Sequence, residues 1–337
     1  MTRETTGSTR TPNTLGPKLA RAFTGRGRFL AAQVLVAGVF MGSLGLADEA
    51  EDGRRVHSGR AKVYTQLAPE SLESLSTPDA IKAVSMPNVA PSRIWRTLEH
   101  GERVECLDCI PYVAKLLYDG HPKTREIGAW WLRRRIFGVF GPDGVYAQVV
   151  QTLGDPTASE GERAYAADAL GEFLTYAGLE PVAEAAVADE SPRVRLHAVR
   201  ALGRMGHEGP QGELAIALGD ESEEVRLAAL EGILRLHRFT GTDAVIACLD
   251  DDSAAVRRRA AQVLSSIHRG PVSDELVEEL EALVSPETEP DAGVRQAAVS
   301  ALGRLAAGGA KSAVSTAAEE DPDPRVRDAA RIALRRL

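Results

Sequence analysis

Aromatic residues make up only 5% of this 337-residue chain, and the alternating Val, Ile and Thr patterns that are typical of β-strands are scarce. Both absences argue against a sheet-based core and favour an all-helical protein. The chain also lacks a Ser-His-Asp order, a glycine-rich phosphate loop and histidines at metal-ligand spacing. We therefore expect a non-catalytic protein without a cofactor, although the sequence alone leaves enzymatic activity open.

Basic residues are fewer than acidic ones, with 40 Lys and Arg against 48 Asp and Glu and a formal net charge of −8. Residues 1–47 carry six of the basic residues and one of the acidic ones, so the remainder of the chain is more acidic still. Sequence-independent binding to nucleic acid requires Lys and Arg to neutralise phosphates. We expect no nucleic-acid partner, and this balance still allows a local basic patch on one face.

The chain has one long uncharged run, residues 29–47, close to its amino terminus. Basic residues precede the run from Arg21 to Arg28, and acidic residues follow it from Asp48. This order, with small residues directly before Asp48, is typical of a signal peptide, and an uncleaved membrane anchor is the main alternative. The run has no terminal cysteine, which argues against a lipoprotein. We expect an exported protein, either in the periplasm or anchored in the inner membrane and facing the periplasm.

Residues 48–92 are rich in Ser, Gly and charge, which predicts a flexible linker with a short helix. An amino-terminal cap over residues 93–109 ends in a C-x-x-C motif, Cys106 and Cys109. A structural disulfide is the leading interpretation in an oxidising compartment. A redox-active pair at a helix start and a metal or haem-type contact are the alternatives. Ile110 follows the motif in place of His, which disfavours covalent haem attachment.

A repeated segment dominates residues 110–337, and its clearest copy is SPRVRLHAVRALGRMG, which begins at Ser191. Five copies share Val-Arg near the start, Ala four residues after the Val, and a large aliphatic residue eight after it. These positions lie on one face of a helix, with a small residue mid-stripe where a neighbouring helix can approach closely. Such a helix cannot bury its apolar face alone, whereas a stack of repeats can. We expect an all-α, right-handed α-solenoid of about seven helix pairs with an irregular amino-terminal helical cap.

Each repeat also carries an arginine, and most repeats carry an aspartate six residues before it. Two degenerate copies precede the five clear ones, and the arginines then recur at intervals of 31 to 38 residues. This spacing predicts a ladder of paired charges along the stack. We interpret the ladder as structural, with hydrogen bonds between repeats that hold the turns; a charged ligand groove is the alternative. Its predicted members are Asp119, Arg125, Arg163, Asp189, Arg195, Asp220, Arg226, Asp251, Arg257, Arg295, Asp321 and Arg327.

The repeat pattern D-x-S-P-x-V-R-x-x-A-x-x-A-L-G-R-x-G resembles HEAT repeats of the short type shared with phycobilisome lyases, over roughly two thirds of the chain. The resemblance implies a protein-interaction scaffold that binds a protein partner on its solenoid surface. Two relatives of this type are associated with enzyme activity. Bilin lyases fit an exported protein poorly. Deoxyhypusine hydroxylase holds two irons with His-Glu pairs on its repeat helices, and the matching slots here are Leu196-His197 and Leu227-Ala228.

The first repeat is the least generic part of the chain because tryptophans and arginines gather there and close to the Cys pair. The leading interpretation is that its aromatic residues cap the open end of the core. The alternative is a partner-binding site, since Trp and Arg are frequent in interface hot spots. With the Cys pair, this alternative describes a redox or cofactor/metal accessory protein of an oxidoreductase. The partner-binding candidates are Trp95, Trp130, Trp131, Arg133, Arg134 and Arg135.

Overall fold

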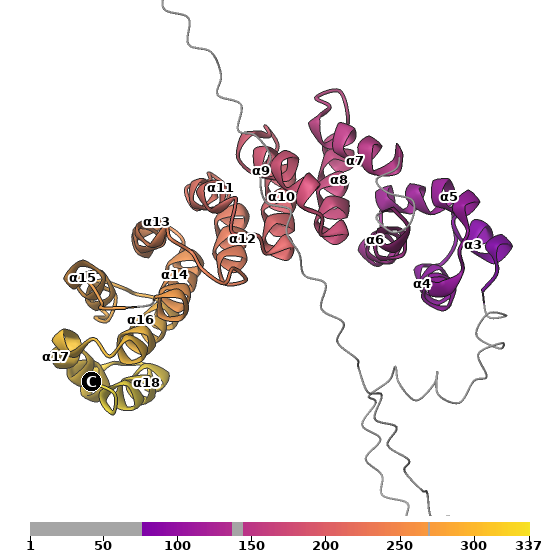
Figure 1. The fold of residues 1–337 in the computed structure, drawn as a ribbon. Helices are drawn as coiled ribbons and strands as arrows, with labels where there is room; N and C mark the ends of the chain where they lie inside the picture. The colour runs from indigo at the N-terminus through magenta and orange to yellow at the C-terminus, as the bar shows by residue number, and fades with distance from the viewer. Residues whose placement is uncertain (1–75, 137–143, 269) are drawn as a thin grey trace, which may run out of the picture. The chain divides into compact units, whose positions relative to one another are not determined.

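The computed structural model describes residues 76–136, 144–268 and 270–337, all of which belong to the unit Ser58–Leu337. The regular elements of these residues are all helices (Figure 1). The expected signal or anchor, 29–47, lies outside the described residues. Within the described part of the chain, no helix is both long enough and apolar enough to span a membrane.

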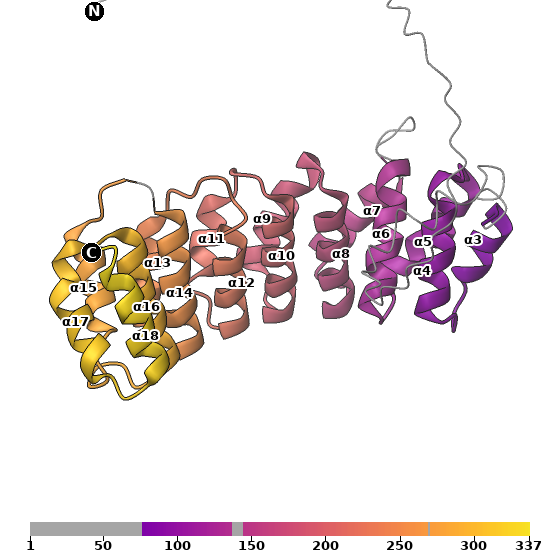
Figure 2. The same cartoon turned by 90° about the horizontal axis from the view of Figure 1, so that it is seen from below.

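The helices form pairs, and the first and second helices of the pairs occupy two separate layers (Figures 1 and 2). The first helices are α3 (Pro78–Val84), α5 (Ile110–Ala114) continued by the 3-10 turn η3 (Lys115–Tyr118), α7 (Gly144–Gly154), α9 (Leu179–Ala188), α11 (Gln211–Ala217), α13 (Thr242–Ala247), α15 (Asp274–Ala282) and α17 (Lys311–Glu320). The second helices are α4 (Pro91–His100), α6 (Pro122–Ile136), α8 (Glu160–Phe173), α10 (Pro192–Met205), α12 (Glu223–Ile233), α14 (Ala254–Ile267), α16 (Ala292–Leu305) and α18 (Pro324–Leu334).

Each second helix packs against the second helices before and after it, from α4 through α18. The predicted all-α solenoid of seven helix pairs is confirmed, beginning with α5 and α6. The short pair α3–α4 precedes them and continues the stack, because α3 packs on α5 and α4 packs on α6.

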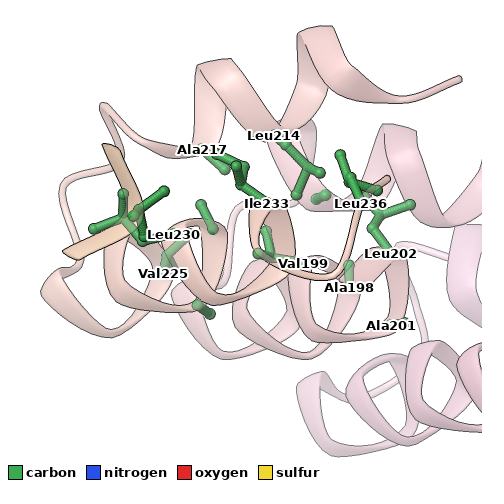
Figure 3. Close-up of a cluster of buried hydrophobic side chains, with 14 of the residues drawn as sticks. Ala198, Val199, Ala201, Leu202, Leu214, Ala217, Val225, Leu230, Ile233 and Leu236 are labelled. Atoms are coloured by element: carbon green, nitrogen blue, oxygen red, sulfur yellow. The ribbon is translucent and has the colours of Figure 1, made fainter. Parts of the chain in front are cut away.

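The predicted apolar stripe of each repeat forms the core. The alanine four residues after the Val is fully buried in all five clear copies, and the residue eight after the Val is fully buried in four of them. Figure 3 shows one section of this core, where Ala198 and Leu202 of α10 lie close to Leu214 of α11 and Ile233 of α12. Leu334, the fifth aliphatic residue, is half-buried because α18 has a second helix on one side only.

Glycines near the carboxyl ends of second helices allow some neighbouring helices to approach unusually closely. A Cβ added to Gly203 of α10 would lie 2.8 Å from the Cα of Gly232 on α12, a distance that real Cβ atoms essentially never show. Small residues therefore lie where two helix backbones meet, because a larger side chain would not fit in the close-packed interior. The corresponding pairs are Gly171 with Ala201 at 2.7 Å and Gly303 with Ala333 at 2.6 Å.

Cys248 lies in the core, as its alignment with Ala217 of the preceding repeat indicates. Its thiol is 5% exposed and lies 3.3 Å from the carbonyl oxygen of Ala244. Burial raises the pKa of this thiol to about 11, so it behaves as a small apolar residue.

Candidate protein-binding surface

The predicted arginines and aspartates form a ladder of ion pairs between consecutive repeats. Arg195 donates from Nε and Nη2 to the two carboxylate oxygens of Asp220 in the next repeat, at 2.6 and 3.0 Å. It also donates from Nη1 to the carbonyl oxygen of Asp189 in its own repeat, at 2.9 Å. Asp220 in turn accepts the backbone N–H of Ser222 at 2.8 Å. One rung therefore holds two turns and joins two repeats.

The same arrangement recurs along the described stack. Glu289 is a ladder residue that the predicted set omits. It lies six residues before Arg295, so the same spacing identifies it once glutamate is accepted as well as aspartate. The further rungs are Arg163 with Asp189, Arg226 with Asp251, Arg257 with Glu289, and Arg295 with Asp321.

Two predicted arginines of the ladder, and with them Asp119, do not form such a rung. The first is Arg125, because Thr157 occupies the position of the expected carboxylate in the next repeat. Its guanidinium instead stacks over the ring of Tyr165 at 3.9 Å and lies 3.6 Å from Asp168. Asp119 supplies only its carbonyl oxygen to Arg125, at 2.9 Å.

The second exception is Arg327 of the last helix pair. It donates to the carbonyl oxygen of Asp321 at 2.6 Å and has no carboxylate partner among the described residues. A following repeat would have to supply that partner.

The serines that precede three of the second helices occupy the N-cap position but do not cap with their side chains. Ser191, Ser222 and Ser253 make no side-chain capping hydrogen bond. The ladder aspartate two residues earlier accepts the N–H of each serine instead. At α18 the N-cap residue is Asp323, and its side chain accepts the N–H of Arg325 at 2.8 Å. The aspartate therefore orders the turn as well as joining the repeats.

The charges of the ladder are neutralised inside the protein. Burial by itself would raise the pKa of Asp220, but hydrogen bonds from Arg195 and Ser222 and the charges of Arg195 and Arg226 outweigh it and lower that pKa. The hydrogen bond to Asp220 raises the pKa of Arg195. Each rung thus satisfies its own charges, which favours a structural role over a ligand groove.

Two of the six partner-binding candidates are buried and contact the protein's own backbone. The indole Nε1 of Trp131 donates to the carbonyl oxygen of Gly101 at 3.1 Å. The guanidinium of Arg135 lies 3.5 Å from the centre of the Trp131 ring and donates to the carbonyl oxygens of Gly101, Glu102 and Val104. Burial lowers the pKa of Arg135 to about 10. These contacts hold the segment after α4 against α6 and leave neither side chain available to a partner.

The other four candidates are at least partly exposed. Trp95, Trp130 and Arg133 are half-buried, and Arg134 is exposed in an ion pair with Glu102. Both half-buried tryptophans pack against the core. Because α3 and α4 continue the stack beyond α5 and α6, Trp130 of α6 lies within the stack and does not close its end.

Cys106 and Cys109 are joined by a disulfide with a Cα–Cα distance of 5.3 Å. Cys109 is fully buried, Cys106 is 8% exposed, and the Cys109 sulfur lies 3.6 Å from the carbonyl oxygen of Pro78 in α3. The motif therefore lies where α3 meets the start of α5. Among the described residues, no group of three or more His, Cys, Asp or Glu side chains is arranged to hold a metal ion.

A charge cluster that no sequence pattern predicted lies on the second helices α6, α8 and α10. Asp168 accepts from Arg204 at 3.0 Å and lies 2.9 Å from Nδ1 of His197. Burial would raise the pKa of Asp168, but His197 and Arg204 outweigh it and lower the pKa, whereas burial raises the pKa of Glu172. A cavity of about 160 Å³ lies beside these residues. The residues come from different repeats, so no local sequence pattern connects them.

The two helix layers carry opposite charge from α9 to α18. The five second helices contain 13 arginines and four acidic residues, whereas the five first helices contain one lysine and 11 acidic residues. The ladder uses four of these arginines. Of the other nine arginines, five also pair with a carboxylate. Arg200, Arg258, Arg304 and Arg327 have no carboxylate partner among the described residues, so the second-helix layer keeps an excess of basic charge.

The sequence of this stack matches the family described as HEAT repeats over residues 146–233, 210–287 and 242–335, which together span more than half of the chain. The chain belongs to the HEAT-repeat family. Its assignment to the phycobilisome-lyase-like type of HEAT repeat stays a prediction. No curated protein matches the chain.

Solved structures of repeat proteins resemble these HEAT repeats in fold. The Escherichia coli protein YibA is 16% identical and aligns over 86% of this chain and 100% of its own length, with a TM-score of 0.51. Kap95p, solved with RanGDP, is 16% identical over 81% of this chain and 42% of its own, with a TM-score of 0.58. Importin beta is 17% identical over 76% of this chain and 39% of its own, with a TM-score of 0.52. At these identities the likeness shows the α-solenoid fold alone.

The HEAT and armadillo-like fold is typical of protein-interaction scaffolds. Its extended stack presents the outer sides of many helices at once. In this protein the two candidate surfaces are the acidic layer of first helices and the basic layer of second helices.

Proposed function

We propose that the protein is an exported, non-catalytic interaction scaffold that binds a protein partner on the surface of its second helices α10 to α18. The charge difference between the layers carries this proposal. The ladder arginines are satisfied internally, whereas exposed arginines such as Arg200 of α10 and Arg258 of α14 have no carboxylate partner in the described part of the chain. Arginine is suited to interfaces because its planar guanidinium binds carboxylates in a bidentate manner. Kap95p, which has the same fold, binds RanGDP.

Site-specific photo-crosslinking tests which layer binds a partner. A photoreactive amino acid would replace Arg200 or Glu231 on second helices, and Glu184 or Glu278 on first helices; all four positions are exposed. We expect a discrete protein adduct from the second-helix positions and none from the first-helix positions, after irradiation in the native host. The absence of an adduct from every second-helix position would overturn the proposed function.

Export is the second part of the proposal, and it rests on the uncharged run 29–47 between basic and acidic residues. A disulfide between Cys106 and Cys109 supports it, because disulfides persist in oxidising compartments. The intact mass of the protein from an exporting host is the test. A mass that begins near Asp48 indicates a soluble periplasmic protein, and the full-length mass indicates an inner-membrane anchor. Recovery of the unprocessed chain from the cytosol contradicts both.

The competing function, a redox or cofactor accessory protein, assigns a chemical role to the Cys pair. Burial of both cysteines favours a structural disulfide, since thiol–disulfide exchange requires an accessible sulfur. Replacement of Cys106 by Ser separates the two functions. A structural disulfide predicts lower thermal stability with partner crosslinking retained, whereas crosslinking lost at unchanged stability supports the accessory role.

A further inference from the structure

A second arginine row follows the ladder arginine by nine residues in five of the seven repeats. It consists of Arg134, Arg204, Arg235, Arg304 and Arg336. These residues lie at the carboxyl ends of the second helices, or just beyond them. Arg204 and Arg304 end a Leu-Gly-Arg sequence, and the structure gives the row a different environment from the ladder.

The glycine of the close helix approach makes room for the arginine of the next repeat. Nη2 of Arg204 lies within 3.0 Å of where a Cβ on Gly171 would be, and Cδ of Arg235 lies within 3.8 Å of the same point on Gly203. Each of these side chains therefore lies over the preceding repeat. In these two repeats, the close contact between helices also determines where the arginine lies.

The row divides into a paired part and an unpaired part. Arg134 pairs with Glu102, and Arg204 pairs with Asp168 and Glu172. Arg235, Arg304 and Arg336 are exposed and have no carboxylate partner among the described residues. Desolvated or unpaired cations at neighbouring positions repel one another, so a complementary anion stabilises them.

A groove between α16 and α18 contains the last two members of the row. Its volume is about 510 Å³, and Gly303 and Ala333 lie in it where the two helices meet. Arg304 and Arg336 line it together with Ile332, whose side chain is 56% exposed. An exposed aliphatic side chain in the same groove as two unpaired guanidiniums fits an acidic segment that also carries apolar residues.

The one carboxylate of the groove and its third arginine are already paired. Asp328 lies 2.9 Å from Arg331, and Arg325 lies 2.7 Å from Asp323. The groove therefore offers two free guanidiniums to a ligand. Two cations and an aliphatic surface on a chain of net charge −8 suit a peptide better than a nucleic acid, which requires many phosphate contacts.

We propose that the groove between α16 and α18 binds an extended acidic protein segment that places a carboxylate on each of Arg304 and Arg336 and an aliphatic side chain against Ile332. Packed helices lie about 8–10 Å apart. A polyproline II chain repeats every three residues with a rise of about 3.1 Å per residue, so carboxylates at i and i+3 match neighbouring repeats. This inference rests on the proposed scaffold function and specifies the chemistry of the partner.

The test uses the full chain and a fluorescein-labelled peptide with Glu-Pro-Val repeated four times, read by fluorescence anisotropy at low salt. The comparison peptides are a Gln-Pro-Val repeat and a peptide of the same composition with its glutamates clustered. We expect the Glu-Pro-Val repeat to bind best, with affinity that falls as salt is raised. Equal binding of the Gln-Pro-Val repeat would overturn the inference.

A matched pair of double variants locates the site. Arg304→Gln with Arg336→Gln removes both free guanidiniums, whereas Arg238→Gln with Arg335→Gln removes the same charge from exposed positions outside the groove. We expect the first to weaken binding by roughly tenfold or more and the second to weaken it little. Circular dichroism melts confirm that both variants fold.

Three outcomes are distinguishable. Equal losses of peptide affinity in the two double variants indicate general charge attraction and overturn the proposal that the groove is the binding site. If the peptide fails to bind while a partner adduct still forms at Glu231, this inference fails and the scaffold function stands. Peptide binding that only the groove variant abolishes supports the inference even where the natural partner is unidentified.

Discussion

At the scale of single residues, the ladder pairs are the most buried ion pairs in the described part of the chain. Arg195 and Asp220 each retain 9% of their side-chain exposure, so neither can exchange its partner for water. Such a pair contributes little compared with apolar packing, but the loss of one partner leaves a buried charge that is poorly compensated. Without Asp220, the carboxylate left to Arg195 is that of the exposed Glu221, at 2.9 Å. The ladder therefore makes each turn dependent on the next repeat.

Replacement of Asp220 by Asn removes the carboxylate and leaves the Arg195 guanidinium buried. We expect the free energy of unfolding to fall by roughly 3 kcal/mol, measured by urea denaturation monitored by circular dichroism. Asp252→Asn is the control, because Asp252 is exposed and contributes only its carbonyl oxygen, to Arg257. Similar midpoints for the two variants would show that the rung contributes little.

The ionisation of Asp220 predicts that the stability of the protein depends on pH. Because the pKa of Asp220 is lowered in the folded protein, its contribution is fully present above the pKa of an unfolded aspartate, about 3.9, and is lost as pH falls through the folded value. Melting temperatures measured from pH 7 to pH 2 should therefore converge for the wild type and Asp220→Asn below about pH 4. A difference in melting temperature that stays constant from pH 7 to pH 2 would contradict stabilisation by the ionised Asp220.

At the scale of the helices, several contacts are made by backbone atoms and small residues and not by large side chains. The apolar stripe of each second helix is narrow and alanine-rich, so helix spacing is set where small residues meet. The contact between Gly203 of α10 and Gly232 of α12 is one such point.

Gly203→Ala should destabilise the protein although alanine is the better helix former. The added Cβ would overlap backbone atoms of α12, and overpacking of this kind costs about 1–3 kcal/mol. Gly212→Ala on α11 is the matched control, since Gly212 is exposed and a Cβ added there would have no heavy atom of a neighbouring element within 4 Å. The control should be neutral or stabilising by up to about 1 kcal/mol. Equal thermal stability of both variants would argue against the close contact.

At the scale of the whole described stack, each second helix packs mainly against its immediate neighbours in the layer. Stability in such a protein is approximately a sum of repeat terms and nearest-neighbour interface terms. A local defect should therefore remain local, unlike a defect in a globular domain.

Hydrogen exchange of the Asp220→Asn variant tests this expectation. We expect faster amide exchange in α9 to α12, which adjoin the broken rung, and unchanged exchange in α16 to α18. The unmodified chain under the same conditions is the reference. A uniform increase over all described helices would show that the stack unfolds as a single cooperative unit.

The sequence by itself determined the second helices, their buried stripe and the number of repeats, because the i, i+4, i+8 pattern is local and recurs in every copy. It also located the ladder residues through their spacing of six. It could not assign their partners, since Arg195 pairs with Asp220 of the next repeat and takes only a carbonyl oxygen from Asp189 of its own.

The tertiary structure alone decided which charged and aromatic residues remain at the surface. Trp131 and Arg135 are buried because the segment after α4 packs over α6, a contact between residues about 30 positions apart. The basic layer and the groove at Arg304 and Arg336 exist because stacking places equivalent helices side by side. A repeat pattern specifies each helix through local contacts, whereas a surface is formed by residues from several repeats and depends on how the repeats pack.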